Sequence, residues 1–283
     1  MLLNQYKIIF RHQLSSVYDA DEVNSFFFLL TEHFHNLKRI DLALYPDFIL
    51  TDYYLKKWNT ALEDLKNFKP IQYIIGKTEF YGLDFKVNKN VLIPRPETEE
   101  LVDWIFHDFH RNESGIKILD IGTGSGCIAI SLSKNLPNAQ VFALDVSEDA
   151  IATAKENALL NNVVVNFLHQ DIFQVENFSE KFDVIVSNPP YVRNLEKHEM
   201  RPNVSEYEPH LALFVENKNP LIFYEKIAEL ASKNLKRSGV LYFEINQYLG
   251  TETSEMLQKK LSPASIELRK DLFDNDRMIK AVI

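Results

Sequence analysis

The fold class can be inferred from the stretch Lys117-Ile-Leu-Asp-Ile-Gly-Thr-Gly-Ser-Gly-Cys127. It joins a β-rich run, residues 117–121, to a glycine-rich turn and then to the helical pattern IAISLSKNL. A strand, a glycine turn and a helix in this order bring backbone N–H groups and the positive end of a helix to a bound ligand. The stretch therefore predicts a cofactor loop in an α/β protein.

Outward from this loop, short β-rich runs alternate with helical patterns such as residues 221–236. The predicted strands comprise residues 117–121, 140–145, 164–171, 182–188, 239–245, 265–271 and 277–283. Strands that alternate with helices predict a doubly wound, parallel sheet, here of seven strands. No helical pattern separates the last two strands, so we expect them to form a hairpin with an antiparallel final strand.

The N-terminal part has a different character, because it lacks glycine before Gly76 and repeats apolar residues at helical spacing. Asp19 or Asp21 and Thr51 or Asp52 precede such segments and are suitable helix caps. The following stretch alternates around Gly82 as a β-hairpin would. The predicted division of the chain is a helical domain at 1–75, a β-hairpin linker at 76–91 and an α/β domain at 92–283.

Composition limits the possible functions. The chain has 283 residues, 46% hydrophobic and 25% charged, which is typical of a soluble globular protein. A net charge of −9 argues against nonspecific wrapping of nucleic acid, which needs Lys and Arg to neutralise phosphates. The single cysteine, Cys127, fits a reducing cytosol, and no apolar run approaches the length of a signal peptide or a membrane span. We expect a cytoplasmic protein that is monomeric and has no membrane partner.

Two carboxylates frame the glycine loop and indicate its ligand. Asp145, at the end of the second strand, can accept hydrogen bonds from both ribose hydroxyls of a nucleoside. The spacing Gly122-x-Gly124-x-Gly126 differs from the G-x-G-x-x-G of NAD sites. Asp120 would repel a pyrophosphate but attract the ammonium group of S-adenosylmethionine. The loop therefore favours S-adenosylmethionine, with an NAD-dependent oxidoreductase as the alternative from another enzyme class.

The fourth predicted strand ends in Ser187-Asn-Pro-Pro-Tyr191. The prolines stiffen the turn and donate no hydrogen bond, which leaves carbonyl oxygens available as acceptors. The side-chain carbonyl of Asn188 and the main-chain carbonyl of Pro189 can accept both hydrogens of an –NH₂ group. This would aim the nitrogen lone pair at a sulfonium methyl, while Tyr191 supplies an aromatic face for the flat group. The motif predicts methyl transfer to an amide- or amine-type nitrogen.

On these motifs the chain resembles the release-factor glutamine methyltransferases, the HemK/PrmC family. Asn-Pro-Pro-Tyr is a signature of methyltransferases that act on planar nitrogens, and the similarity extends from about residue 70 to the C-terminus. The matching segments are GKTEFYGLDFKV (76–87), LIPRPETE (92–99), DIGTGSG (120–126), NPPY (188–191), YEPHLAL (207–213), EINQ (244–247) and DLFDNDR (271–277). The segment at 92–99 is the most discriminating, because nucleic-acid methyltransferases do not carry Ile-Pro-Arg-Pro-Glu-Thr-Glu.

The resemblance implies a class I methyltransferase (Rossmann-like) fold, S-adenosylmethionine as cofactor, and peptide chain release factors as protein substrates. The modified atom would be the side-chain nitrogen N5 of the glutamine in their Gly-Gly-Gln motif, and the helical domain would dock on the factor. Residues and resemblance together predict cofactor contacts at Asp120, Gly122, Thr123, Gly124, Ser125, Gly126, Asp145, Asp171, Ile172 and Asn188. The predicted substrate contacts are Asn188, Pro189, Pro190, Tyr191, Arg95 and Glu97, of which Asn188, Pro189 and Tyr191 are the catalytic candidates.

Within these predictions, Asp171 would meet the adenine amine and Ile172 would pack on its face. No metal site is expected, since His33 and His35 point apart on a helix and have no third ligand. The rival with the same chemistry is an N6-adenine or N2-guanine methyltransferase, which would need a basic recognition surface. One departure from the family is Asn246, where Gly usually follows Glu-Ile; we expect it to lie beyond the site.

Overall fold

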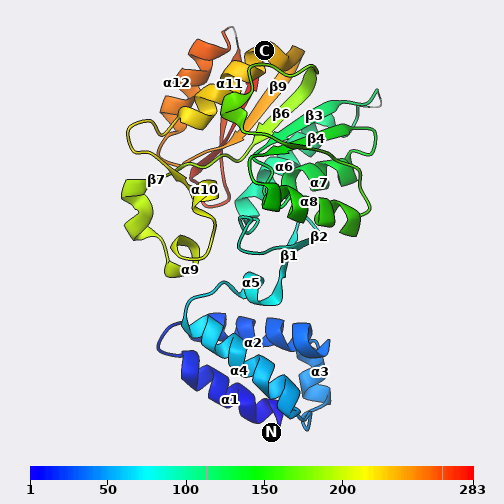
Figure 1. Cartoon of the computed structure of the whole chain (residues 1–283), viewed down its shortest axis with the longest axis vertical. Helices are drawn as coiled ribbons and strands as arrows, with labels where there is room; N and C mark the ends of the chain where they lie inside the picture. Colours follow the sequence, from blue (N-terminus) through cyan, green and yellow to red (C-terminus); the bar gives the residue numbers. More distant parts are fainter. Residues whose placement is uncertain (113, 263) are drawn as a thin grey trace. The chain divides into compact units, whose positions relative to one another are not determined.

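The computed structural model describes residues 1–112, 114–262 and 264–283 (Figure 1). Two compact units are present, one of Met1–Gly76 with Pro202–Tyr207 and one of Lys77–Arg201 with Glu208–Ile283. The first unit is helical, as expected from its sequence. Its helices are α1 (Leu3–Leu14), α2 (Ala20–His35), α3 (Arg39–Leu44), α4 (Asp52–Lys66), α5 (Ile71–Ile75) and α9 (Pro202–Ser205).

The caps of two helices confirm the sequence prediction. The Asp19 carboxylate accepts hydrogen bonds from the first backbone N–H groups of α2, and the Thr51 hydroxyl accepts one from Tyr54 N at 3.5 Å in α4. In α2, Leu29 is 44% exposed while Phe27 is fully buried. A continuous run of three phenylalanines and two leucines hides the helical period, so packing alone decides which of them face inward.

Trp58 is the centre of the helical unit. Its side chain is fully buried, and its indole Nε1 donates a hydrogen bond to His35 Nε2 at 3.0 Å. The rings of Tyr6, Phe10 and Phe27 pack around it with centroid distances of 5.4, 5.8 and 5.0 Å. Four aromatic side chains therefore pack together in the middle of this core, and aliphatic residues surround them.

The second unit is built on a seven-stranded sheet, which confirms the predicted fold class (Figure 1). The strand order is β10-β11-β9-β6-β3-β4-β5. All neighbours from β9 to β5 are parallel, and β11 pairs antiparallel with both β9 and β10, as expected for a final hairpin. The strands are β3 (Lys117–Ile121), β4 (Gln140–Asp145), β5 (Asn166–His169), β6 (Phe182–Ser187), β9 (Leu235–Glu244), β10 (Ser265–Lys270) and β11 (Asp276–Val282).

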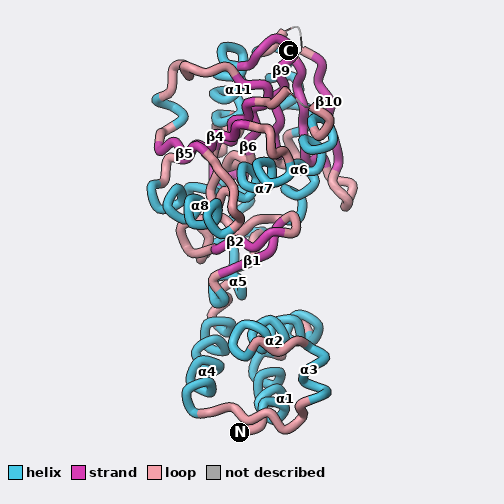
Figure 2. The backbone as a smooth tube through the Cα atoms, turned by 90° about the vertical axis from the view of Figure 1, so that its right-hand side faces the viewer, coloured by secondary structure: helices cyan, strands magenta, loops and turns pink. Residues whose placement is uncertain are grey.

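Helices cover both faces of this sheet, and two hydrophobic clusters fill the space between the layers (Figure 2). One face packs against α6 (Pro96–Phe109), α7 (Cys127–Asn135) and α8 (Glu148–Leu160). The other packs against α11 (Ile222–Asn234), α12 (Gly250–Lys260) and the short 3₁₀ turn η1 (Ile172–Gln174). The inner strands are buried on both sides, which explains why their sequences read as continuous apolar runs.

The register of the parallel strands aligns their carboxyl ends. Ile121 of β3 lies opposite Leu144 of β4 and Ser187 of β6, and Ser187 lies opposite Phe243 of β9. The residue that follows each of these four is polar or glycine. They are Gly122, Asp145, Asn188 and Glu244. The strand register therefore places these four candidate functional residues at the same edge of the sheet.

The predicted β-hairpin is present as β1 (Lys77–Phe80) and β2 (Leu83–Lys86), paired antiparallel around Gly82. Its buried Phe80 and Phe85 join the hydrophobic cluster of the second unit. The sequence did not predict the short elements after β6. They are β7 (Val192–Arg193), η2 (Asn194–Glu199), α10 (His210–Leu213) and β8 (Phe214–Val215). Within the described part of the chain, no helix has the length and apolarity needed to cross a membrane.

Replacement of Trp58 by Ala is expected to lower the free energy of unfolding by about 3–5 kcal/mol, since it removes the largest buried side chain of the helical unit. The measurement is chemical denaturation followed by circular dichroism. Tyr53→Ala is the control, because Tyr53 lies on the same helix and is 62% exposed; its effect should stay within about 0.5 kcal/mol. Equal losses in the two variants would contradict this account of the core.

Candidate active site

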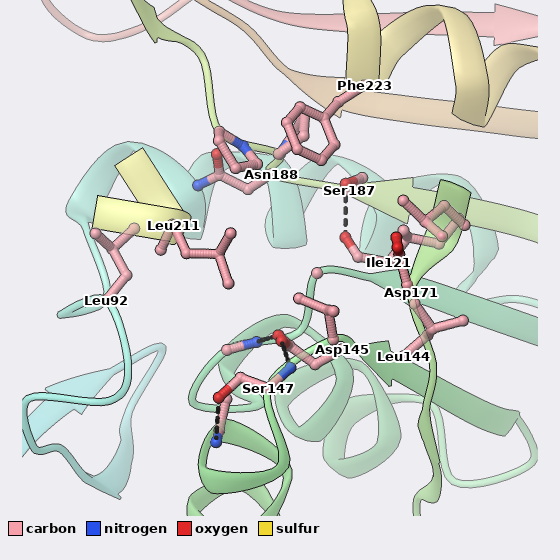
Figure 3. A pocket seen from close by; sticks show the side chains of 18 of the residues that line it. Leu92, Ile121, Leu144, Asp145, Ser147, Asp171, Ser187, Asn188, Leu211 and Phe223 are labelled. Atoms are coloured by element: carbon pink, nitrogen blue, oxygen red, sulfur yellow. Dashed lines mark hydrogen bonds between the residues drawn. The ribbon is translucent and has the colours of Figure 1, made fainter. Parts of the chain in front are cut away.

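A cavity of about 320 Å³ opens at the carboxyl ends of β3, β4, β5 and β6 (Figure 3). This is the edge at which open α/β sheets bind ligands, and the volume suits a small-molecule site. Its wall contains eight of the predicted site residues. These are Gly122, Gly124, Asp145, Asp171, Ile172, Asn188, Pro189 and Pro190. Three further regions contribute to the wall: residues 90–92 and residues 209–212, which overlap the family segments at 92–99 and 207–213, and α11, which the sequence did not single out.

The glycine loop after β3 forms the floor of the cavity. Gly122 and Gly124 have φ angles of +76° and +54°, and no atom lies within 4 Å of where a Cβ would stand on either. The backbone is therefore bare where a ligand would approach. Gly126 has another role, because a Cβ there would meet Ile130 at 2.8 Å and Ala154 at 3.1 Å. It lies outside the cavity wall and allows α7 and α8 to pack closely.

Asp145 shapes the loop with its carboxylate. Oδ2 accepts a hydrogen bond from Gly124 N at 2.8 Å and Oδ1 accepts one from Ser147 N at 2.9 Å (Figure 3). Burial raises the pKa of Asp145, while these N–H groups act in the opposite direction. Each carboxylate oxygen has a second lone pair, so the side chain can still accept two ligand hydroxyls. This arrangement suits the ribose contact that the sequence predicted.

Asp120 lies behind the loop and is completely buried. Its Oδ2 accepts a hydrogen bond from the Thr123 hydroxyl at 2.6 Å, whereas its Oδ1 has no hydrogen-bond partner among the described residues. Burial raises the pKa of Asp120 to about 7, and the nearby charge of Asp145 adds to the effect. A buried oxygen without a partner is costly, so this carboxylate is suited to a cationic ligand group. Asp120, Thr123 and Ser125 do not line the cavity themselves.

The far end of the cavity is apolar. Asp171 caps η1 by accepting a hydrogen bond from Phe173 N at 2.9 Å, and both residues line the wall with Ile172. The ring of Phe173 packs against Phe223 of α11 at a centroid distance of 5.0 Å. Phe223 also faces the cavity (Figure 3). These rings offer a flat apolar surface of the kind that binds an aromatic base, and the sequence identified only Asp171 and Ile172.

Asn188 follows β6 and lies across the cavity from Asp145 (Figure 3). The preceding Ser187 ties the ends of two strands together, because its hydroxyl donates to Ile121 O at 2.6 Å. Asn188 Nδ2 donates to Thr98 Oγ1 at 3.3 Å, whereas Oδ1 accepts no hydrogen bond from the described residues. The amide thus keeps its acceptor end available beside two prolines that donate no hydrogen bond.

Tyr191 is placed differently from the prediction. It was expected to offer an aromatic face to the substrate, but it does not line the cavity. Its hydroxyl donates to Glu244 Oε1 at 3.1 Å, and its ring packs against the hydrophobic cluster beneath the sheet edge. Burial and the Glu244 charge raise the pKa of Tyr191 far above its ordinary value. A tyrosine that stays protonated can support the loop after β6 from below.

Arg95 and Glu97 also lie outside the cavity wall. The Arg95 guanidinium forms an ion pair with Glu208, whose side chain is 1% exposed. The second Glu208 oxygen accepts a hydrogen bond from Ile93 N at 3.1 Å. Two wall segments, residues 90–92 and 209–212, are joined in this way. The geometry therefore gives Arg95 a supporting position rather than one that faces the ligand.

Asn246 lies outside the cavity wall, but it contacts the loop that follows β6. Its Nδ2 donates to Tyr191 O at 3.0 Å and to Glu196 Oε2 at 3.2 Å. The side chain therefore holds the last residue of the Asn-Pro-Pro-Tyr motif to the end of β9. A family position that usually holds glycine is used here to fasten the loop. Sequence spacing gave no signal of this contact, because 55 residues separate the partners.

Among residues 1–112, 114–262 and 264–283, no group of three or more His, Cys, Asp and Glu side chains is arranged to hold a metal ion. His35 accepts the hydrogen bond of Trp58 in the helical core instead.

Comparison with known proteins identifies the family. The chain is 58% identical over 282 residues to the release factor glutamine methyltransferase of Flavobacterium psychrophilum, with 99% of each chain covered. Identity to the enzyme of the same name from Bacteroides thetaiotaomicron is 42% over 280 residues, again with 99% of each covered. The chain belongs to the release factor glutamine methyltransferase family.

Two domain families match within this member of the release factor glutamine methyltransferases. Residues 10–76 match the PrmC N-terminal domain, and residues 103–204 match the methyltransferase small domain. A methyltransferase of Pyrococcus furiosus shares the fold, with a TM-score of 0.52, 21% identity, and coverage of 79% of this chain and 98% of the other. The expected enzyme class and the cofactor S-adenosylmethionine are thereby confirmed.

The residues of the cavity fit this cofactor. The bare backbone at Gly122 and Gly124 admits a ligand, and both Asp145 oxygens retain lone pairs for hydroxyl groups. The Phe173 and Phe223 rings match the base, and the charge of Asp120, which lies behind the glycine loop and not on the cavity wall, would attract the ammonium of the methionine part. Individual contacts between these residues and the cofactor stay predictions.

Binding of S-adenosylmethionine is expected to weaken as the pH falls below about 7. Asp120 has a raised pKa in the free protein and is protonated below that value, whereas an ammonium group binds the ionised form. The dissociation constant should therefore rise by up to about tenfold per pH unit below pH 7. It should change least between pH 7 and about 7.7, above which the α-amino group of the ligand loses its own proton. Isothermal titration calorimetry between pH 5.5 and 8.5 measures this.

Asp120→Asn provides the matched test, because it removes the charge and keeps the shape. Its affinity for the cofactor should be lower at pH 8 and should lose most of the pH dependence. A wild-type affinity that stays constant between pH 5.5 and 8.5 would refute a role for the Asp120 charge.

Proposed function

We propose that the chain transfers a methyl group from S-adenosylmethionine to the side-chain amide nitrogen N5 of the glutamine in the Gly-Gly-Gln motif of peptide chain release factors. The reaction would take place in the cytoplasm. The names of the two relatives support the substrate class, and the chain covers 99% of each. The positions of individual oxygen atoms in the cavity wall support methyl transfer to an amide nitrogen.

The observation that carries the proposal is the position of Asn188. It lies on the cavity wall with an unused side-chain oxygen, and it precedes the carbonyl groups of Pro189 and Pro190 on the same wall. Oxygen acceptors are what an amide –NH₂ needs, since both of its hydrogens must be held for the lone pair to face a methyl donor. Pro189 and Pro190 have no main-chain N–H group, so they add no hydrogen-bond donor beside these acceptor oxygens.

The reacting nitrogen is a weak nucleophile because its lone pair is delocalised into the amide. Fixed acceptors for both hydrogens favour a pyramidal nitrogen as the new bond forms, and they act by position rather than as a base. The bound cofactor supplies an electrophilic methyl group. After transfer the nitrogen carries one extra proton, which can leave to water through the open mouth of the cavity.

Charge disfavours the nucleic-acid alternative. The chain carries −9 overall, and residues 1–75 contain eight Lys and Arg against nine Asp and Glu. A methyltransferase that flips a base from a duplex needs a basic surface for the backbone. A protein substrate does not require such a basic surface.

Asn188→Ala is expected to lower kcat for release-factor methylation by about 10²–10³-fold while the dissociation constant of the cofactor changes less than about threefold. Asn194→Ala, at an exposed position six residues later, is the control. Rates come from tritiated cofactor, and mass spectrometry of the treated factor locates the methyl group. A methyl group on any residue other than the Gly-Gly-Gln glutamine, or label in RNA or DNA alone, would refute the proposed function.

A further inference from the structure

The proposed acceptor oxygen faces its substrate only if the Asn188 amide has one particular orientation. Asparagine can rotate by 180° about its last bond, which exchanges the oxygen and the NH₂ group with little change in shape. The flipped amide would present a donor to a substrate –NH₂ group, and the two would repel. Something in the protein must select the correct orientation before the substrate arrives.

Thr98 is the residue in contact with this amide. It stands in the first turn of α6, is 2% exposed, and receives the hydrogen bond from Asn188 Nδ2 at 3.3 Å. Its own hydroxyl hydrogen points the other way, to Glu244 Oε2 at 2.6 Å. Because this hydrogen is committed to a carboxylate, the oxygen of Thr98 offers only lone pairs to Asn188. Only the NH₂ end of Asn188 can satisfy it.

Glu244 gives the chain of hydrogen bonds its direction. It is 1% exposed at the end of β9, and its other oxygen accepts the Tyr191 hydroxyl hydrogen at 3.1 Å. An ionised carboxylate can only accept, so both neighbouring hydroxyls must donate to it. Buried hydrogen-bond networks of this kind fix a single arrangement when every member is satisfied.

We infer that Thr98 and Glu244 are positioning residues that hold the Asn188 side-chain oxygen toward the substrate. The inference rests on the proposed function and extends it to two residues outside the cavity wall. Neither touches the substrate. Asn188 donates to Thr98, and Thr98 donates to Glu244. This order of donors and acceptors orients the Asn188 oxygen before the substrate binds.

The test compares Thr98→Val with Thr98→Ser. Valine keeps the shape of threonine but removes the hydroxyl, so kcat should fall about 10- to 100-fold, as expected when a reacting group loses its orientation. Serine restores the hydroxyl and should recover most of kcat. The dissociation constant of the cofactor and the melting temperature serve as controls, and Thr31→Val is matched, because Thr31 is also buried on a helix with its hydroxyl bonded only to Phe27 O.

Glu244→Gln provides the second, independent variant. Its NH₂ group can donate to Thr98, which frees the Thr98 hydrogen and removes the preference for one Asn188 orientation, so a similar loss in kcat is expected. The double variant Thr98→Val/Glu244→Gln should be no slower than the slower single variant, since both act through one path. Additive losses, equal losses for Thr98→Val and Thr98→Ser, or unchanged kcat in both single variants would overturn the inference.

These outcomes are distinct from a failure of the proposed function. If the wild-type enzyme leaves the release-factor glutamine unmodified, the function itself is wrong. If the wild-type enzyme is active but the variants give one of the contradicting outcomes named above, only the positioning role of Thr98 and Glu244 is wrong.

A separate observation concerns the helical unit. A cavity of about 240 Å³ lies among α1, α2 and the start of α3. Lys7, Arg11 and Arg39 line it together with a single carboxylate, Asp21. None of the three cations forms an ion pair with a described residue. Three of the eight Lys and Arg side chains in residues 1–75 thus meet at one place, where Asp21 is the single carboxylate.

An aromatic ring keeps these cations close together. Lys7 Nζ lies 4.4 Å and Arg39 Cζ 5.0 Å from the centroid of the Phe28 ring. Arg11 is held from the side, since its Nε donates to Asn24 Oδ1 at 2.8 Å. Burial and the charges of Arg11 and Arg39 lower the pKa of Lys7. An anion in the cavity would relieve this repulsion.

We propose that this cavity, lined by Lys7, Arg11 and Arg39, receives carboxylate side chains of the protein substrate. This extends the proposed function to the recognition of the release factor. Carboxylates fit better than a nucleic-acid backbone, because the cavity is small and the surrounding residues 1–75 are not basic overall. Charge complementarity of this kind governs docking and its salt dependence.

Lys7→Glu/Arg39→Glu should raise KM for the release factor about tenfold, with kcat within twofold, and the difference should shrink at high salt. Lys56→Glu is the control, an exposed cation of the same unit outside the cavity, and Lys7→Gln/Arg39→Gln is the milder variant. Polyglutamate should compete with the factor for the wild-type enzyme, whereas an RNA oligonucleotide should not. Equal KM values for the variants and the control, or competition by RNA alone, would overturn the proposal.

Discussion

The alignment of strand ends in the parallel sheet is the constraint on which the rest of the site depends. Hydrogen bonding fixes Ile121, Leu144, Ser187 and Phe243 in one row, and the Ser187 hydroxyl reinforces that row by its bond to Ile121 O. A shift by one residue in any strand would turn its terminal side chain to the other face of the sheet. The apolar strand interiors set the register of the strands. This register places the cofactor loop and the Asn188 loop side by side.

This constraint also explains how much of the protein was predictable. The glycine-loop and Asn-Pro-Pro-Tyr motifs each follow a strand, and the alternation of strands and helices suffices to bring strand ends to one edge. The glycine loop, Asp145, Asp171 and Asn188 were found in this way, and they line one cavity. The antiparallel final hairpin followed from the missing helix between the last two strands.

The features that could not be predicted depend on contacts between residues that are far apart in the sequence. Thr98 and Glu244 are separated by 146 residues and meet only because α6 packs beside the end of β9. The orientation of Tyr191 toward Glu244 follows from that same packing, and no local pattern distinguishes it from a tyrosine that faces the cavity. Phe223 looked like any apolar residue of an amphipathic helix, and α1 lacked a recognisable cap. Periodicity identifies elements, whereas side-chain partners are decided by tertiary packing.

Two buried carboxylates at this edge have opposite roles, and their hydrogen bonds show why. Burial raises the pKa of both Asp120 and Glu244. Both oxygens of Glu244 have a protein partner, Thr98 at one and Tyr191 at the other, and the residue is buried outside the cavity wall, so it holds the protein's own groups in place. Asp120 has one oxygen without a partner, which leaves its charge uncompensated in the free protein. A buried charge of that kind is tolerated where a ligand completes it. The satisfied carboxylate therefore supports the loop of Asn188, and the unsatisfied one is the predicted partner of the cationic cofactor.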